Sequence, residues 1–168
     1  MSERGAPLPL RALDAVTQGF NVAGSILILG LMLLIGADVA GRNLFGRPVP
    51  GVPEAVSLSI VAIVFLQVPM ALRMGRIARS EALLRALPAR VGRALESLFD
   101  LAGIAAVGAI VWTTWPILTR AWERNLFVGS LGDITFPVWP VKVCIVAGGT
   151  LLALQFAARI WRRYGGYP

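Results

Sequence analysis

Four long apolar segments, separated by short clusters of charged residues, dominate the pattern of the chain. The clearest of them, Ala55 to Leu72, runs for 18 residues without a charge. As a helix it would extend about 27 Å, close to the thickness of a bilayer's hydrocarbon core. The pattern therefore predicts an all-α integral membrane protein with four transmembrane helices, at about residues 15–40, 53–72, 98–118 and 135–161.

Residues 80–98 follow a different pattern, in which apolar residues recur every three or four positions within a charged segment. The apolar positions are Leu84, Leu87, Val91, Leu95 and Leu98, and the charged positions on the opposite side are Glu81, Arg85, Arg90, Arg93 and Glu96. This spacing predicts an amphipathic helix, or two short helices that meet near Pro88. We expect this segment to lie in the headgroup plane, with packing on the bundle as a cytoplasmic helix as the alternative.

The distribution of arginines predicts the orientation in the membrane. Four spans place both termini on the same side, which would carry 11 of the 15 arginines and leave four on the other side. The positive-inside rule then predicts cytoplasmic termini, a cytoplasmic amphipathic segment and two outward-facing loops. Because no basic cluster precedes a short apolar core near the N-terminus, we expect the first helix to be retained and not removed as a signal peptide.

Composition narrows the possible chemistry. The 168 residues are 57% hydrophobic and carry a net charge of +7, which fits one membrane domain, residues 1–168, with arginines at anionic headgroups and no nucleic-acid partner. The chain has no histidine and a single cysteine, Cys144. Haem ligation, histidine-based proton transfer, disulfide exchange and cysteine-based metal sites are therefore disfavoured. We predict no catalytic, cofactor-binding or metal site, and no enzyme activity.

The turn between the first two helices contains the first candidate site. Asp38 and Arg42 are four residues apart at the end of the first helix, and Glu54 lies in the first turn of the second helix, near the positive end of its dipole. These residues could form an ion or substrate site at the outer mouth. We interpret them instead as an ion pair and a carboxylate that fix the loop, because functional charges usually lie nearer the middle of the membrane.

Within the predicted spans, the most polar uncharged side chains are those of Gln67 and Gln155. A glutamine in a membrane helix usually makes an interhelical hydrogen bond, and contact of Gln67 with a partner protein is the alternative. Asp100 and Lys142 are interpreted as interfacial charges, and Cys144 as a small packing residue.

The order of several short motifs resembles that of a known family. Asp38, the segment Gly41–Arg47, a proline and glycine turn, Glu54, and an apolar helix with Phe65-Leu66-Gln67 and Pro69 follow one another as in the small, DctQ-type membrane subunit of tripartite ATP-independent periplasmic (TRAP) transporters. The segment Ile134–Trp139 before the last helix extends the resemblance over most of the chain.

The resemblance implies an accessory scaffold subunit in the bacterial inner membrane. It would form a stable complex with a large, sodium-coupled membrane subunit and would help take up an organic acid delivered by a periplasmic binding protein. Substrate recognition would belong to the other polypeptides, so this chain does not define the substrate. The expected partner contacts are Gln67, Leu84, Leu87 and Val91, on the amphipathic segment and the first two spans.

The four outward-facing arginines are candidates for docking the binding protein, because they would attract an acidic surface. They are Arg42, Arg47, Arg120 and Arg124, and ordinary contact with lipid headgroups is the alternative interpretation.

A second hypothesis is a self-sufficient four-helix transporter of the small multidrug type, acting as a homodimer. Such transporters need a carboxylate embedded in the first span, and the acid that residues 15–40 supply, Asp38, lies at the outer end. Two further classes, a membrane enzyme and a four-span protein without a transport role, have no motif in their favour.

Overall fold

The computed structural model describes residues 8–75, 89–129 and 135–165. Within them lie four helices that are long and apolar enough to cross a membrane. They are α1 (Leu8–Phe45), α2 (Val52–Arg73), α4 (Ala89–Glu123) and α5 (Trp139–Gly165). The prediction of a helical protein with four spans is therefore confirmed.

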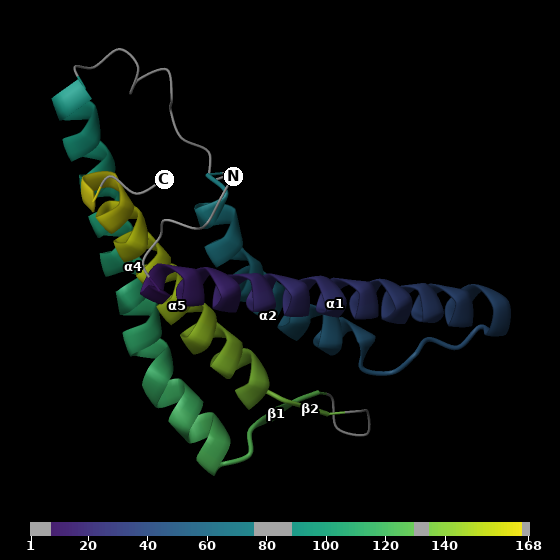
Figure 1. Ribbon diagram of the computed structural model, residues 1–168. Coiled ribbons are helices and arrows are strands. Elements are labelled where there is room, and N and C mark those ends of the chain that lie inside the picture. The colour runs from purple at the N-terminus through teal and green to yellow at the C-terminus, as the bar shows by residue number, and fades with distance from the viewer. Residues whose placement is uncertain (1–7, 76–88, 130–134, 166–168) are drawn as a thin grey trace.

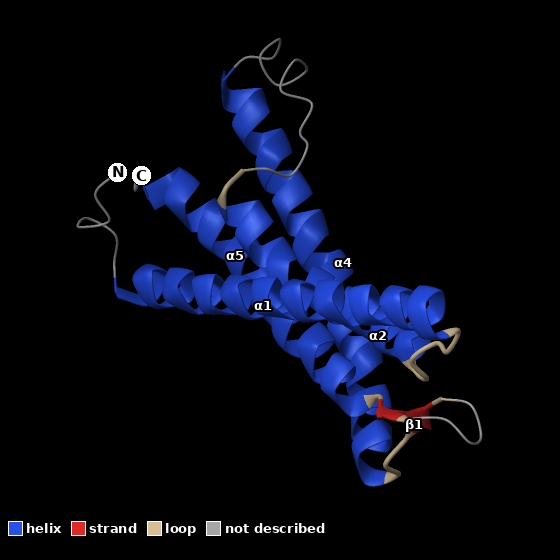
Figure 2. Cartoon of the chain, turned by 90° about the vertical axis from the view of Figure 1, so that its right-hand side faces the viewer, coloured by secondary structure: helices blue, strands red, loops and turns tan. Residues whose placement is uncertain are grey.

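Helix α5 is the centre of the bundle. It packs against α4 along one side and against α2 along another, and it also meets α1, which packs mainly on α2. Figures 1 and 2 show α4 and α5 side by side, with α1 running across their direction and extending well beyond them. The 38 residues of α1 give it a length of about 57 Å, which exceeds the thickness of a hydrocarbon core.

A small apolar core holds three of the helices together. Leu72 of α2, Val107 of α4 and Leu152 of α5 are buried against one another, with Val68, Val111, Ala153 and Phe156 around them. Because water does not drive helices together inside a bilayer, tight packing of this kind stabilises the bundle through van der Waals contact.

Two glycines allow the helices to approach closely. A Cβ atom on Gly148 of α5 would overlap the backbone carbonyl of Phe65 in α2, so any larger residue would push these helices apart. A Cβ on Gly103 of α4 would lie 2.7 Å from the ring of Phe156 in α5. Small residues at helix crossings have this role in membrane proteins generally.

The helix boundaries differ from those expected from the sequence. Helix α1 extends beyond both limits of the predicted span at 15–40. Helix α4 begins at Ala89 and continues without interruption to Glu123, so residues 89–98 are its first turns and not a separate helix. The sequence from Ala89 to Trp115 has no proline, so nothing in it forces a break. The rest of the predicted amphipathic segment, including Leu84 and Leu87, lies outside the described residues.

A short hairpin joins α4 to α5. Strand β1 (Phe127–Val128) pairs antiparallel with β2 (Phe136–Pro137), with Phe127 opposite Pro137 and Val128 opposite Phe136. Next to it, the rings of Trp122 and Trp139 meet edge to face with centroids 4.9 Å apart. The hairpin and this ring pair fix the end of α4 against the start of α5.

Candidate functional site

Asp38 organises the loop between α1 and α2. Its Oδ2 atom accepts a hydrogen bond from Nε of Arg42 at 2.9 Å, and its Oδ1 atom accepts one from the backbone N–H of Val49 at 2.8 Å. The loop turns through Gly46 and Gly51, which both have positive φ, and Gly51 caps α2. The carboxylate thus joins the last turns of α1 to the chain that leads into α2.

Glu54 takes no part in these contacts. It lies in the first turn of α2, after Gly51 and Pro53. Its backbone carbonyl accepts a hydrogen bond from the hydroxyl of Ser57 at 2.9 Å. Within the described residues, no hydrogen bond or ion pair joins the carboxylates of Glu54 and Asp38 to a common partner. The structure therefore brings Asp38 and Arg42 together and leaves Glu54 at the helix N-terminus.

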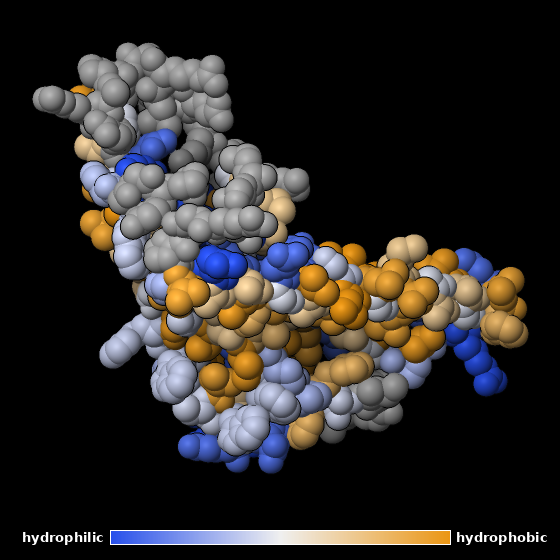
Figure 3. Space-filling model, in the orientation of Figure 1, coloured by the Kyte–Doolittle hydropathy of each residue, from blue (hydrophilic) through white to orange (hydrophobic). Residues whose placement is uncertain are grey.

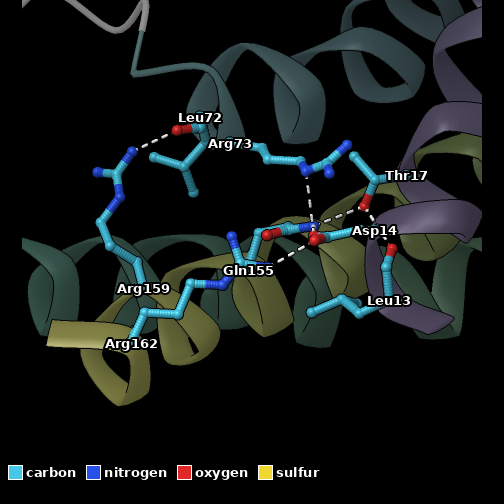
Figure 4. A network of polar contacts seen from close by, with 8 residues as sticks. All are labelled: Leu13, Asp14, Thr17, Leu72, Arg73, Gln155, Arg159 and Arg162. Atoms are coloured by element: carbon cyan, nitrogen blue, oxygen red, sulfur yellow. Dashed lines mark hydrogen bonds and ion pairs between the residues drawn. The ribbon is translucent and has the colours of Figure 1, made fainter. Parts of the chain in front are cut away.

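At the opposite end of the bundle, Asp14 of α1 connects three helices (Figure 4). Its Oδ1 atom lies 3.2 Å from Nε of Arg73 in α2, and its Oδ2 atom lies 2.7 Å from a terminal nitrogen of Arg162 in α5. Gln155 of α5 donates to Oδ1 of Asp14 at 3.3 Å and to the hydroxyl of Thr17 at 2.7 Å. Gln155 thus makes the interhelical hydrogen bonds expected of a membrane glutamine.

Asp100 of α4 is the centre of a second cluster beside the first. It is 1% exposed, and its two oxygens lie 3.3 Å from Arg159 and 3.1 Å from Arg163, both in α5. Arg163 also pairs with Glu96 at 3.0 Å, one turn earlier in α4. Arg159 extends its other terminal nitrogen to the carbonyl of Leu72 at the end of α2.

We call these residues together the arginine network, comprising Asp14, Arg73, Glu96, Asp100, Gln155, Arg159, Arg162 and Arg163. It touches all four helices. Each arginine faces a carboxylate, and the arginine side chains are only 12–24% exposed. Because a buried charge is very unfavourable without a partner, the network gives each arginine a carboxylate, with Asp14 and Asp100 each shared by two arginines, and it fixes the relative positions of the helix ends.

The arginine network was not predicted from the sequence. Asp100 was interpreted as an interfacial charge, and Asp14 was assigned no role, yet both are central to it. One signal was available, because Arg159, Arg162 and Arg163 repeat at helical spacing and so share one face of α5. Their partners could not be identified in this way, since Asp14 and Arg162 are 148 residues apart.

Gln67 lies in a groove between α1 and α2. A Cβ on Gly24 of α1 would lie 2.8 Å from Cγ of Gln67, so the glutamine side chain rests directly on the α1 backbone. The groove has a volume of about 410 Å³ and is also lined by Asn21. Two residues with side-chain amides, Asn21 and Gln67, therefore line the same groove.

The remaining predicted contact residues lie on the surface. Arg47, Arg120 and Arg124 are exposed at the end of the molecule that carries the two short loops, and Val91 is half exposed on α4. In Figure 3, hydrophobic surface covers most of α1, and hydrophilic residues gather at its far end and near the lower end of α4.

The described residues contain no group of three or more histidine, cysteine, aspartate or glutamate side chains placed to hold a metal ion. The carboxylates of Asp38 and Asp100 are instead engaged with arginines, and Asp38 also accepts a hydrogen bond from a backbone N–H. The fold and these contacts define a multi-pass membrane protein of four helices, tied together by ion pairs at one end.

Comparison with protein families identifies this membrane protein further. Residues 31–166 match the model of the tripartite ATP-independent periplasmic transporters, DctQ component. The chain belongs to this family and is the small membrane subunit of a TRAP transporter. The family consists of transporter components and not of enzymes. No curated protein and no solved structure gave a significant match.

Proposed function

We propose that this chain is a scaffold for a large, sodium-coupled membrane subunit, with which it forms a stable complex in the bacterial inner membrane. The complex would take up an organic acid delivered by a periplasmic binding protein. The small subunit would widen and brace the static part of the transporter, so that the moving part of the large subunit has a fixed reference.

The arginine network is the observation that carries this proposal. Asp14 and Asp100 lie where a transporter could use an acidic group, but both are held by arginines from other helices. A carboxylate that binds and releases a cation in each cycle must exchange partners, whereas one fixed between two guanidinium groups favours a single arrangement. A rigid tie between helix ends suits a scaffold better than an ion pathway.

The proposed orientation places the arginine network on the cytoplasmic side. Of the 15 arginines, 11 lie near the two termini, near the end of α2, near the start of α4 or between these two helices, and the positive-inside rule assigns such regions to the cytoplasm. The α1–α2 loop and the β1–β2 hairpin would then face the periplasm.

That orientation makes the exposed arginines of the two outer loops candidates for docking the binding protein. Arg42 is half exposed even though it is paired with Asp38, and Arg47 and Arg124 are exposed. A binding protein with an acidic rim would be steered towards them, with a strong dependence on salt concentration.

A self-sufficient drug transporter is not favoured. Asp38, the acidic residue on which that hypothesis depends, is held by Arg42 and by the N–H of Val49, and the family is one of transporter components.

Co-purification tests the proposed function. The tagged chain would be extracted from its native membrane in a mild detergent, and its partners would be identified by mass spectrometry. We expect a much larger polytopic protein in near-equimolar amount. Recovery of the chain alone, or only as a homo-oligomer, would contradict the proposal.

A further inference from the structure

The groove between α1 and α2 combines apolar walls with two amides. Its lining includes Val64 and Val68 of α2 and Met74, which follows α2, together with Asn21 of α1 and Gln67 of α2. The α2 side of its rim is open, since Val64 is 47% and Met74 is 50% exposed. A bulky apolar group could therefore enter without displacing any part of the bundle.

The two amides are held in place by the packing of α1 on α2. Gly24 lies one helical turn from Asn21 and provides the space in which the Gln67 side chain rests. The Nε2 atom of Gln67 lies 3.2 Å from the position that a Cβ of Gly24 would occupy, so the amide is kept beside α1. Asn21 and Gln67 thus line the same opening, with the Gln67 side chain held against α1.

These amides lie at membrane depth. Gln67 is six residues before Arg73, and Asn21 is seven residues after Asp14. At 1.5 Å per residue they lie about 9–11 Å along their helices from the ion pair of Asp14 with Arg73, towards the middle of the bilayer. Neither amide has a hydrogen-bond partner among the residues that the structure describes.

An amide without a partner is unfavourable in hydrocarbon, because no water is available to replace the missing hydrogen bonds. Other polar side chains of the spans avoid this problem locally. Thr113 and Thr150, for example, donate to carbonyls of their own helices. Asn21 and Gln67 are distinguished from these side chains by facing an open groove.

We propose that the groove receives a transmembrane helix of the large subunit, which places a hydrogen-bonding side chain between Asn21 and Gln67. This inference rests on the proposed function and adds a location for the contact. The entering helix would fill the apolar walls and supply both a donor and an acceptor to the amides.

A lipid fits this groove less well than a helix does. Acyl chains form no hydrogen bonds, and the ester groups of a phospholipid accept hydrogen bonds but cannot donate them. Each amide has an oxygen that needs a donor as well as an NH₂ group that needs an acceptor. A serine, threonine, asparagine or glutamine on a partner helix satisfies both needs at a fixed depth.

Substitution of the amides by leucine tests the polar part of the proposal. In the complex with the large subunit, we expect N21L and Q67L each to weaken association about threefold to thirtyfold, measured as subunit retention during detergent dilution. Leucine favours membrane insertion, so failed insertion would not explain the loss. Gln18→Leu is the matched control, since Gln18 is exposed on the same helix but does not line the groove. Unchanged retention in the N21L/Q67L double variant would overturn the proposal.

Photo-crosslinking identifies the occupant directly. A benzoylphenylalanine at position 64, on the groove rim, should crosslink to the large subunit in native membranes, and mass spectrometry would locate the helix. Crosslinks only to lipid, or only to a second copy of this chain, would overturn the groove assignment. If the large subunit co-purifies but these two tests fail, the groove inference alone is wrong. If no large subunit co-purifies, the proposed function fails as well.

Discussion

Asp100 shows how a single buried acid can determine the arrangement of a membrane bundle. It belongs to α4, yet it pairs with Arg159 and Arg163, which both come from α5. Arg159 also reaches the carbonyl of Leu72, in the last turn of α2. The side chain is 1% exposed, so lipid headgroups and water do not share in its neutralisation. Its loss therefore affects the contact between three helices.

We expect Asp100→Asn to destabilise the protein by about 3–5 kcal/mol, because it leaves buried guanidinium charge without its counter-ion. Thermal unfolding in detergent, followed by the loss of monodisperse protein, measures the effect. Glu123→Gln is the matched control, since Glu123 is exposed at the end of the same helix, and we expect a change within about 0.5 kcal/mol. Equal stability of the two variants would show that the ion pairs of Asp100 contribute little.

Asp38 differs from Asp100 because its partner Arg42 is 54% exposed. A surface ion pair of this kind contributes only about 0–1 kcal/mol. In Asp38→Asn the amide oxygen can still accept the hydrogen bond from Val49, so we expect little loss of stability and retained uptake by the assembled transporter. Loss of uptake in a complex that still assembles would instead assign Asp38 to ion coupling. Glu54→Gln serves as the control at the same loop.

At the level of the helices, the contact between α2 and α5 depends on the absence of a side chain at Gly148. An added methyl group would overlap the carbonyl of Phe65, a backbone atom that cannot move without moving α2. The distance between α2 and α5 at this crossing therefore depends on the contact of Gly148 with Phe65.

We expect Gly148→Ala to destabilise the bundle by about 1–3 kcal/mol through overpacking. Gly108→Ala on α4 is the control, because a Cβ there meets nothing within 4 Å, and alanine favours helix by about 1 kcal/mol relative to glycine. The same unfolding assay in detergent compares the two variants. If Gly148→Ala is as stable as Gly108→Ala, the close approach of α2 and α5 is not required.

The positions of the four spans could be predicted from the sequence, but several boundaries could not. Apolar runs of sufficient length identify membrane helices because the bilayer excludes charge over a fixed thickness. The same rule does not predict where a helix ends once it has left the hydrocarbon core. Helix α1 therefore continues to Phe45 past Asp38 and Arg42, and α4 begins at Ala89 within a charged segment.

The ion pairs of the arginine network also could not be predicted from the sequence. Spacing within one helix predicted the pair of Asp38 with Arg42, since residues four apart share a face. The partners of Asp14 lie in α2 and α5, and the choice among the arginines depends on how the helices cross. The hairpin of β1 and β2 is likewise too short to leave a pattern of alternating residues.

For the whole molecule, the strongest expectation concerns the side of the membrane on which the arginine network lies. A Cys144→Ala background removes the single native thiol. In intact spheroplasts, a membrane-impermeant thiol reagent should label Phe127→Cys in the hairpin and should leave Met74→Cys, at the end of α2, unlabelled. Both positions are exposed in the isolated chain, at 57% and 50%, and labelling of both in permeabilised spheroplasts would show that access differs through the membrane and not through cover by the large subunit. Labelling of Met74→Cys alone would reverse the proposed topology.

The central place of α5 also has a consequence for biosynthesis. The ribosome produces this helix after the other three, yet α5 contacts each of them and supplies Gln155, Arg159, Arg162 and Arg163 to the arginine network. Asp14 can meet Arg73 once the first two helices are inserted, but it gains Arg162 only after α5 has been made. A prematurely terminated chain therefore lacks the helix around which the others pack, and we expect membrane proteases to remove such a chain.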